Sequence, residues 1–247
     1  MSKEGEKNML KEAINRILEL AEPHIREVKG SLYCDKDMKR LDEDIRAAAL
    51  QMGTLSSLVD FIKGSCDFKD CQYIVQVVSP TEVRLLSCLD KDRKRETLAE
   101  VRAEIPDFPF GRFTENEQFI IGVQSKFVDG EDKKVILAFA GNVKAGTVEK
   151  YGDDGVSQKA AIKRGVTSMS EVEVPSPCML APYRTFTEVS QPESGFIFRV
   201  KDDERCGGVA CALFEADGGA WKHAAKENIK AFLEKSLDGI GNVVVIA

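Results

Sequence analysis

Paired β-rich runs separated by turn residues constrain the fold of this chain more than any other feature. The clearest pair is QYIVQVVSPTEVRLLSCLD (72–90), in which two such runs flank Ser79-Pro80-Thr81. A second pair, TVEKYGDDGVSQKAAIKRG (147–165), flanks Gly152-Asp153-Asp154-Gly155. Both patterns are typical of β-hairpins. Because hairpins build antiparallel or mixed sheets, we predict an α+β fold rather than a doubly wound parallel sheet.

Other segments extend this sheet in the prediction. The run KKVILAFAG (133–141) is almost continuously apolar, which favours a central strand. Short β-rich or alternating runs predict the remaining strands at 171–174, 183–189, 195–200, 208–216 and 242–247. We therefore expect strands to outnumber helices after residue 66.

Three helices are predicted among these strands. One follows residue 95, with Leu98, Val101 and Ile105 facing inward. The next begins at a capping-box pattern, Thr114 to Glu117, ahead of Phe119, Ile120, Val123 and Phe127. The last lies in DGGAWKHAAKENIKAFLEKSLDG (217–239), where Gly239 closes it. Its inward face is predicted to hold Trp221, Ala225, Ile229, Phe232, Leu233 and Leu237.

The first 65 residues read as helical, and we predict an N-terminal arm or layer (1–65) followed by an α+β core domain (66–247). The first helix carries Met9, Ile14, Ile17 and Leu18 on one stripe and ends near Pro23. Two further helical stripes follow, made of Ile45, Ala48, Ala49 and Met52, and of Leu55, Leu58, Val59 and Ile62. An exposed stripe on the first helix needs a partner, so we expect a homo-oligomer.

Charge and hydropathy exclude some classes of protein. The net charge of −6 disfavours general binding to duplex DNA, which requires a basic surface. No apolar run approaches the roughly 20 residues of a membrane helix. The start, MSKEGEKNMLKEAINRILEL, lacks the apolar core of a signal peptide, so we expect a cytoplasmic protein without a membrane segment.

The seven cysteines have irregular spacing. Cys66 and Cys71, and likewise Cys206 and Cys211, are separated by four residues, the loose end of the spacing seen in zinc sites. We expect reduced structural thiols without zinc, and a four-thiolate site is the alternative. With His24 and His223 as the only histidines, histidine-rich metal sites have little to work with. We expect no cofactor.

The segment 183–200 holds the first candidate site. In a strand over 183–189, Arg184, Phe186 and Glu188 would share one face and Tyr183 the other. Arg199 follows on the next strand. A sheet with an aromatic core explains this pattern, and a binding groove is the alternative.

Three other sets of residues invite a functional interpretation. Lys91, Arg93, Lys94 and Arg95 could bind phosphate or form a solvated helix start. Gly218 and Gly219 precede a helix, where free amides could hold an anion, although a tight turn explains them equally well. Asp153 and Asp154 are interpreted as turn residues rather than metal ligands.

A resemblance to a known family indicates the origin of the chain. PYRTFTEVSQPESGFIFR (182–199), with FEADGGAWK behind it and TLSSLVDFIK in front, resembles the YfdQ-like family of phage and prophage proteins. The similarity runs from about Leu55 to Leu237 and carries over no catalytic residues. It implies a phage or prophage accessory gene of the kind found among early genes near recombination and single-strand-binding functions.

The leading hypothesis is a phage accessory protein that acts by binding, as a homo-oligomer, in host takeover, phage DNA metabolism or counter-defence. One alternative is a protein that binds single-stranded nucleic acid, using strand aromatics with Arg112, Arg184 and Arg199. Another is a metal-dependent enzyme acting on phosphate esters or nucleotides through Asp153, Asp154, Glu188 or Asp217. The third is a self-assembling shell or ring. Nucleic acid or a nucleotide-like small molecule is the expected partner besides the chain itself.

Overall fold

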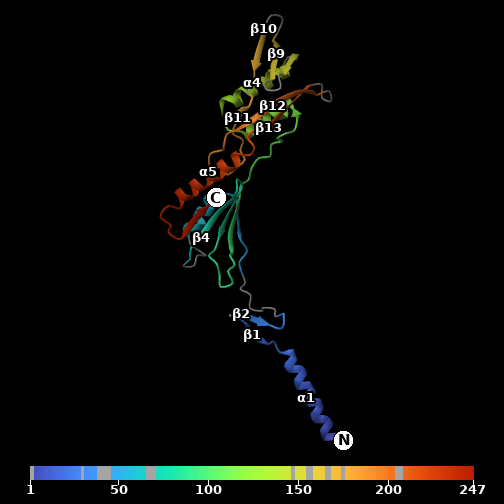
Figure 1. Cartoon of the computed structure of the whole chain (residues 1–247). Helices are drawn as coiled ribbons and strands as arrows, with labels where there is room; N and C mark the ends of the chain where they lie inside the picture. Colours follow the sequence, from blue (N-terminus) through green and yellow to red (C-terminus); the bar gives the residue numbers. More distant parts are fainter. Residues whose placement is uncertain are drawn as a thin grey trace. The chain divides into compact units, whose positions relative to one another are not determined.

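The structure is a computed structural model. It describes residues 3–28, 31–37, 46–64, 71–145, 148–153, 158–164, 168–173, 176–203 and 208–247. The predicted fold class is confirmed: antiparallel and mixed sheets are combined with helices, and a helix comes first along the chain (Figure 1).

The chain divides into two compact units, Met1–Arg46 and Ala47–Ala247. The first holds helix α1 (Lys3–Ala21) and a hairpin of β1 (Ile25–Val28) and β2 (Ser31–Cys34). Pro23 lies just after α1, because its ring cannot continue a helix. The 1–65 arm that the sequence predicts is thus longer than the first unit of the structure, since α2 (Leu55–Gly64) belongs to the second.

A five-stranded sheet holds one core of the second unit. Its strand order is β14-β4-β5-β6-β3, antiparallel through β4, β5 and β6 and parallel at both edges. The strands are β3 (Leu50–Met52), β4 (Tyr73–Ser79), β5 (Glu82–Leu86), β6 (Thr97–Arg102) and β14 (Val243–Ile246). Helices α2 and α5 (Trp221–Ser236) contribute Leu55, Leu58, Ile229 and Leu233 to this core. The predicted hairpin around Pro80 and the C-terminal strand are confirmed.

Two predicted helices are strands in this sheet. The segment after residue 95 forms β6, because Ala99 and Val101 pair with Leu85 and Val83 of β5 and are completely buried. The stripe that ends at Met52 was predicted as helix, but residues 50–52 form β3 and obtain backbone partners from β6. Ile45 lies outside the described residues.

A second core lies on a four-stranded sheet with the order β11-β12-β13-β7. Its strands are β7 (Thr114–Glu115), β11 (Cys178–Leu180), β12 (Ser194–Asp203) and β13 (Gly208–Glu215). Helices α3 (Asn116–Lys126) and α4 (Glu131–Ala145) pack on it, with α3 supplying Phe119 and Val123 to the core. Glu115, not Thr114, caps α3 by accepting from the backbone N–H groups of Glu117 and Gln118 at 3.2 and 3.3 Å.

The predicted strand 133–141 is wrong, since it lies within helix α4. Ile136, Phe139, Ala140 and Val143 repeat at helical spacing and are buried. The side chain of Asn116 fixes this packing by donating to the carbonyl of Ala140 at 2.9 Å. A buried helix and a buried strand share the same continuous apolar composition, which explains the error.

The second predicted hairpin is confirmed by β8 (Val148–Asp153) and β9 (Gln158–Arg164). Together with β10 (Ser168–Glu173) they form an antiparallel sheet of order β10-β9-β8. Asp153 ends β8, and Asp154 lies outside the described residues.

The predicted strand 183–189 is also wrong. Between β11 and β12 the chain forms bends and a turn instead of a strand. The side chain of Gln191 holds this loop, because it accepts from the backbone N–H groups of Arg184 and Thr185 at 3.0 and 3.2 Å. It also donates to the carbonyls of Phe186 and Val189 at 3.0 and 3.3 Å. Backbone groups that a sheet would pair are thus satisfied by one side chain.

The disulfide Cys71–Cys88 corrects the prediction that all thiols are reduced. The two Cα atoms lie 6.0 Å apart, within the range that a disulfide spans. Cys178 and Cys211 are free and buried, and burial raises the pKa of each thiol to about 12. Cys66 and Cys206 lie outside the described residues.

Helix α5 is confirmed, but its inward face is narrower than predicted. Ala225, Ile229 and Leu233 are buried, whereas Trp221 and Phe232 are only partly buried. Full burial of Phe232 would imply a cost of about 3–5 kcal/mol for Phe232→Ala. Because the ring is only partly buried, this substitution is expected to lower the free energy of unfolding by about 1–2 kcal/mol, in proportion to the apolar area it removes. Urea denaturation measures it, and a loss above about 3 kcal/mol would show that the ring is fully packed.

Candidate functional site

The loop 181–193 connects the two cores of the second unit. Phe186 at its centre is 1% exposed and belongs to the core of the five-stranded sheet. Phe196, just beyond the loop, belongs to the other core. The hydroxyl of Thr185 donates to the carbonyl of Pro80 at 2.5 Å, and Asn228 of α5 donates to the carbonyl of Ser190 at 2.9 Å. The loop is therefore held from both sides.

Arg184 is the buried charge of this loop. Its side chain is 6% exposed, and Nη1 donates to Glu215 Oε1 at 2.8 Å. Nη2 donates to the hydroxyl of Ser194. Burial lowers the pKa of Arg184 to about 10, and the neighbouring carboxylates of Glu215 and Asp217 act in the opposite direction. A buried guanidinium is costly unless it is paired, so Glu215 is needed here.

Trp221 stacks on this guanidinium. The Cζ atom of Arg184 lies 3.8 Å from the centre of the indole ring and 5.6 Å from the ring of Phe196, distances typical of cation–π contacts. Two buried donors, Arg184 Nε and Trp221 Nε1, have no acceptor among the residues that the structure describes. Buried polar groups without partners are uncommon in folded proteins, so these two donors indicate a candidate functional site around Arg184 and Trp221.

A cavity of about 260 Å³ adjoins Arg184. Its walls come from the irregular loop 105–110, from Lys126 at the end of α3 and from residues 182–184. The lining residues are Ile105, Pro106, Asp107, Phe108, Phe110, Lys126, Pro182, Tyr183 and Arg184. The cavity is mostly apolar and is also lined by the cationic Lys126 and Arg184 and the acidic Asp107, a combination typical of small-molecule sites.

Tyr183 and Arg184, predicted as binding residues, thus line one cavity together. Phe186 and Glu188 line another, of about 330 Å³, beside the start of α2. There the carboxylate of Glu188 accepts from the backbone N–H of Ser56 at 3.3 Å, so it helps to satisfy a helix terminus. Arg199 is partly buried on β12 and lines neither cavity.

In the turn before α5, the carboxylate of Asp217 takes the position that a bound anion would occupy. Gly218 and Gly219 adopt positive φ angles of 63° and 84°, which glycine allows at little cost. The carboxylate of Asp217 accepts from the N–H groups of Gly219 and Trp221 at 3.0 and 3.1 Å. Because these amides are occupied, the geometry favours the tight turn over a bound anion.

The basic patch Lys91, Arg93, Lys94 and Arg95 lies in the connection between β5 and β6, not at a helix start. All four residues are exposed. Asp90 organises the turn by accepting from the backbone N–H groups of Asp92 and Lys94 at 2.9 and 2.7 Å. Nη1 of Arg95 donates to the carbonyl of Ser87 at 2.7 Å, so part of the patch stabilises the turn.

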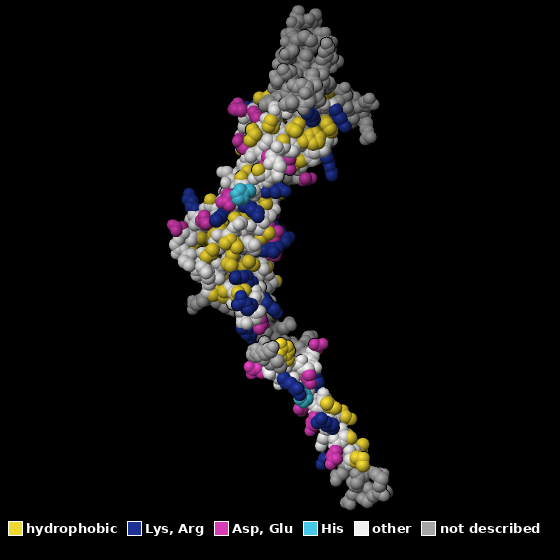
Figure 2. All heavy atoms as spheres, viewed as in Figure 1, with side chains coloured by type: hydrophobic (Ala, Val, Ile, Leu, Met, Phe, Trp, Pro, Cys, Tyr) yellow, Lys and Arg dark blue, Asp and Glu magenta, His cyan; other side chains and the backbone are white. Residues whose placement is uncertain are grey.

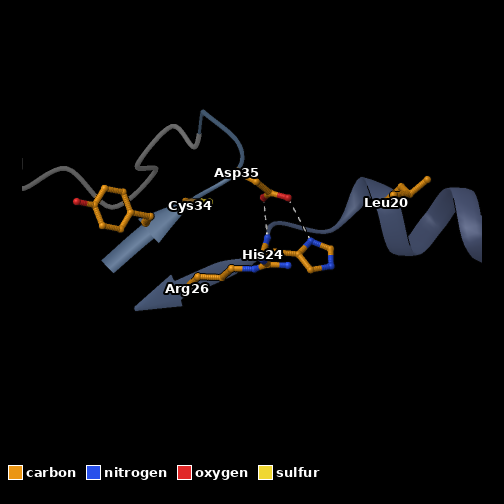
Figure 3. A pocket seen from close by; sticks show the side chains of 6 residues that line it. Leu20, His24, Arg26, Cys34 and Asp35 are labelled. Carbon is orange, nitrogen blue, oxygen red and sulfur yellow. Dashed lines mark hydrogen bonds and ion pairs between the residues drawn. The ribbon is translucent and has the colours of Figure 1, made fainter. Parts of the chain in front are cut away.

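The first unit has a separate pocket of about 410 Å³ (Figure 3). His24 lies beside Asp35: its backbone N–H donates to the carboxylate at 2.8 Å, and Nδ1 is 3.3 Å from the other oxygen. The backbone hydrogen bond holds the pKa of Asp35 below its ordinary value. Arg26, Tyr33 and Cys34 also line it, and all its side chains are exposed. A ligand there would stay hydrated, so we place the candidate site at the cavity beside Arg184.

Two alternative functions find little geometric support. Phe196 and Phe198 are at most 3% exposed, so these strand aromatics offer no surface on which bases could stack. The carboxylate of Glu188 accepts a backbone hydrogen bond at the N-terminal end of α2, and that of Asp217 does so at the N-terminal end of α5. The two carboxylates thus serve two different helices. In the described part of the chain, no three His, Cys, Asp or Glu side chains come together in a way that could hold a metal ion.

Sequence reasoning missed several residues of the cavity. Phe108 and Phe110 lie in PDFPFGRF, where two prolines and three aromatics in an irregular stretch were a usable signal. Lys126 carried no such signal, since only the folded chain brings it near Tyr183 and Arg184. None of the helices described by the structure is both long and apolar enough to cross a membrane. Comparisons with family models, curated proteins and solved structures gave no match.

Proposed function

We propose that this chain is a phage- or prophage-encoded accessory protein that works by binding, as a homo-oligomer, in the cytoplasm of a bacterial host. Its role would lie in host takeover, phage DNA metabolism or counter-defence. The resemblance of residues 182–199 to the YfdQ-like family supports the origin. The observation that carries the proposal is the exposed apolar face of α1 (Figure 2).

This face is large for a surface helix. Leu10, Ile14, Ile17 and Leu18 are 64%, 49%, 65% and 58% exposed, and they recur at helical spacing. On another side of the helix, Arg16 and Glu19 form an ion pair at 2.8 Å. An amphipathic helix with an uncovered stripe is unstable alone in water, and a second copy of the same helix covers it with matching apolar side chains. Self-association through α1 is therefore the simplest use of this face.

Deletion of residues 1–30 is the direct test, measured by size-exclusion chromatography with light scattering. We expect the full chain to form a homo-oligomer and the deletion variant to have a lower order while Ala47–Ala247 stays folded. Ile17→Glu should have the same effect, because it places a charge within the apolar stripe. Asn15→Glu is the matched control, since it adds the same charge about 160° around the helix. A monomeric full-length chain, or a deletion variant of unchanged order, refutes the proposal.

A further inference from the structure

We propose that the cavity beside Arg184 binds a small molecule made of one planar ring with an anionic substituent. This site is independent of the self-association face on α1. Two sources share this chemistry, aromatic carboxylic acids and nucleoside monophosphates whose base enters the cavity.

The size and walls of the cavity select a single ring. About 260 Å³ corresponds to roughly nine water molecules, since each water occupies about 30 Å³ of the liquid. Phe108, Phe110 and Tyr183 provide aromatic walls, and Pro106 and Pro182 add rigid apolar ones. Planar ligands stack well on such surfaces.

The aromatic wall is pre-formed. The ring of Phe108 lies 4.8 Å from that of Phe110 and 4.9 Å from that of Phe127. It also lies directly over Gly122, where an added Cβ would come within 3.1 Å of Phe108 Cε2. Gly122 therefore allows α3 to approach this ring closely. A wall fixed on three sides requires little ordering when a ligand enters.

Two cationic residues, Lys126 and Arg184, line the cavity together with the acidic Asp107. The ammonium of Lys126 donates one of its hydrogens to the carbonyl of Asp107, which leaves further donors for a ligand. Arg184 also lines the cavity, but its Nε is buried away from solvent and its guanidinium is already paired with Glu215. Glu215 balances the charge of Arg184, and the carboxylate of Asp107 is exposed. Lys126 therefore supplies the charge that selects an anion.

The binding experiment uses the full chain and two pairs of probes that differ in charge. They are benzoate with benzamide, and uridine monophosphate with uridine. Trp221 is the only tryptophan and stacks on Arg184, so its fluorescence reports on the site, and calorimetry gives the affinity. We expect one anionic probe to bind with Kd below about 1 mM, within the efficiency of small ligands. Its neutral counterpart should bind at least about tenfold more weakly. Benzoate binding identifies an aromatic acid, and uridine monophosphate binding a nucleotide.

Variants then assign the binding to this cavity. Lys126→Met should weaken the anionic probe about tenfold, and Tyr183→Leu should weaken both members of the pair. The matched control is Lys134→Met, an exposed lysine on α4 that pairs with Glu131 and does not line the cavity, and it should leave Kd unchanged. Tyr183→Leu decides the matter if Lys126→Met does not fold. The proposal is overturned if none of the probes binds, if the neutral probes bind equally well, or if binding survives the folded cavity variants.

Discussion

Phe186→Ala is expected to lower the free energy of unfolding by about 3–5 kcal/mol, the usual cost of removing a buried phenylalanine ring. The ring is 1% exposed and packs in the core that α2, α5 and the five-stranded sheet share. It comes from a loop that forms an isolated β-bridge at Pro182 but no regular strand, so its apolar contacts contribute strongly to anchoring the 181–193 segment. Urea denaturation followed by circular dichroism measures the loss.

Phe113→Ala is the control for this substitution. Phe113 is 37% exposed and contacts the ring of Phe214 at 6.0 Å between centroids. Its removal should cost less than about 1 kcal/mol, because much of the ring already contacts water. Equal losses for the two variants would mean that Phe186 does not anchor the loop. The Trp221 emission should also shift in Phe186→Ala alone, since the loop holds Arg184 against the indole.

Hairpins were the most predictable part of the fold because their signal is local. The runs on both sides of Pro80 are β-rich, and β4 and β5 pair across the turn with a shift of register between Val77 and Ser79. Residues 133–141 and 97–102 show the limit of such reasoning. The first is apolar on nearly every position, and Leu98 and Val101 of the second lie by chance at helical spacing with Ile105 just beyond it. In the folded chain, residues 97–102 pair with β5 and form a strand despite the helical spacing of their apolar residues.

The candidate site was only partly predictable. Tyr183 and Arg184 stood out by their composition, but the strand from which we placed them does not exist. Gln191 replaces the sheet by satisfying four backbone groups of the loop. That hydrogen-bonding pattern depends on a bend in the backbone of the loop, and the hydrophobic periodicity of the sequence does not predict such a bend. The partner of Arg184, Glu215, is 31 positions away, and an ion pair of that separation leaves no trace in local sequence.

The disulfide was unpredictable for a similar reason. Our sequence interpretation compared Cys66 with Cys71, which are close along the chain, and not Cys71 with Cys88. The bonded pair is brought together by the β4–β5 hairpin, since Cys71 lies just before β4 and Cys88 just after β5. Ile74 and Leu86 are already paired across these strands. The bond therefore closes the open end of a hairpin that hydrogen bonds have aligned.

Reduction of Cys71–Cys88 should lower the free energy of unfolding by about 3 kcal/mol, from the loop-closure entropy of its 17-residue separation. For a folded unit of this size the melting temperature should fall by about 6–12 °C. Calorimetry with and without a reductant measures the change. A variant that combines Cys71→Ser and Cys88→Ser should melt at the lower temperature and be insensitive to the reductant.

Cys34→Ser serves as the control, because Cys34 is exposed in the other unit and forms no disulfide in the described structure. This variant should respond to the reductant as the unmodified chain does. The thiols of Cys178 and Cys211 do not confuse the comparison, since burial keeps them protonated at pH 8. If the unmodified chain melts at the same temperature with and without the reductant, the bond contributes nothing to the fold. The β4–β5 hairpin is then held by its backbone pairing and by the packing of Val75, Val77, Val83 and Leu85 alone.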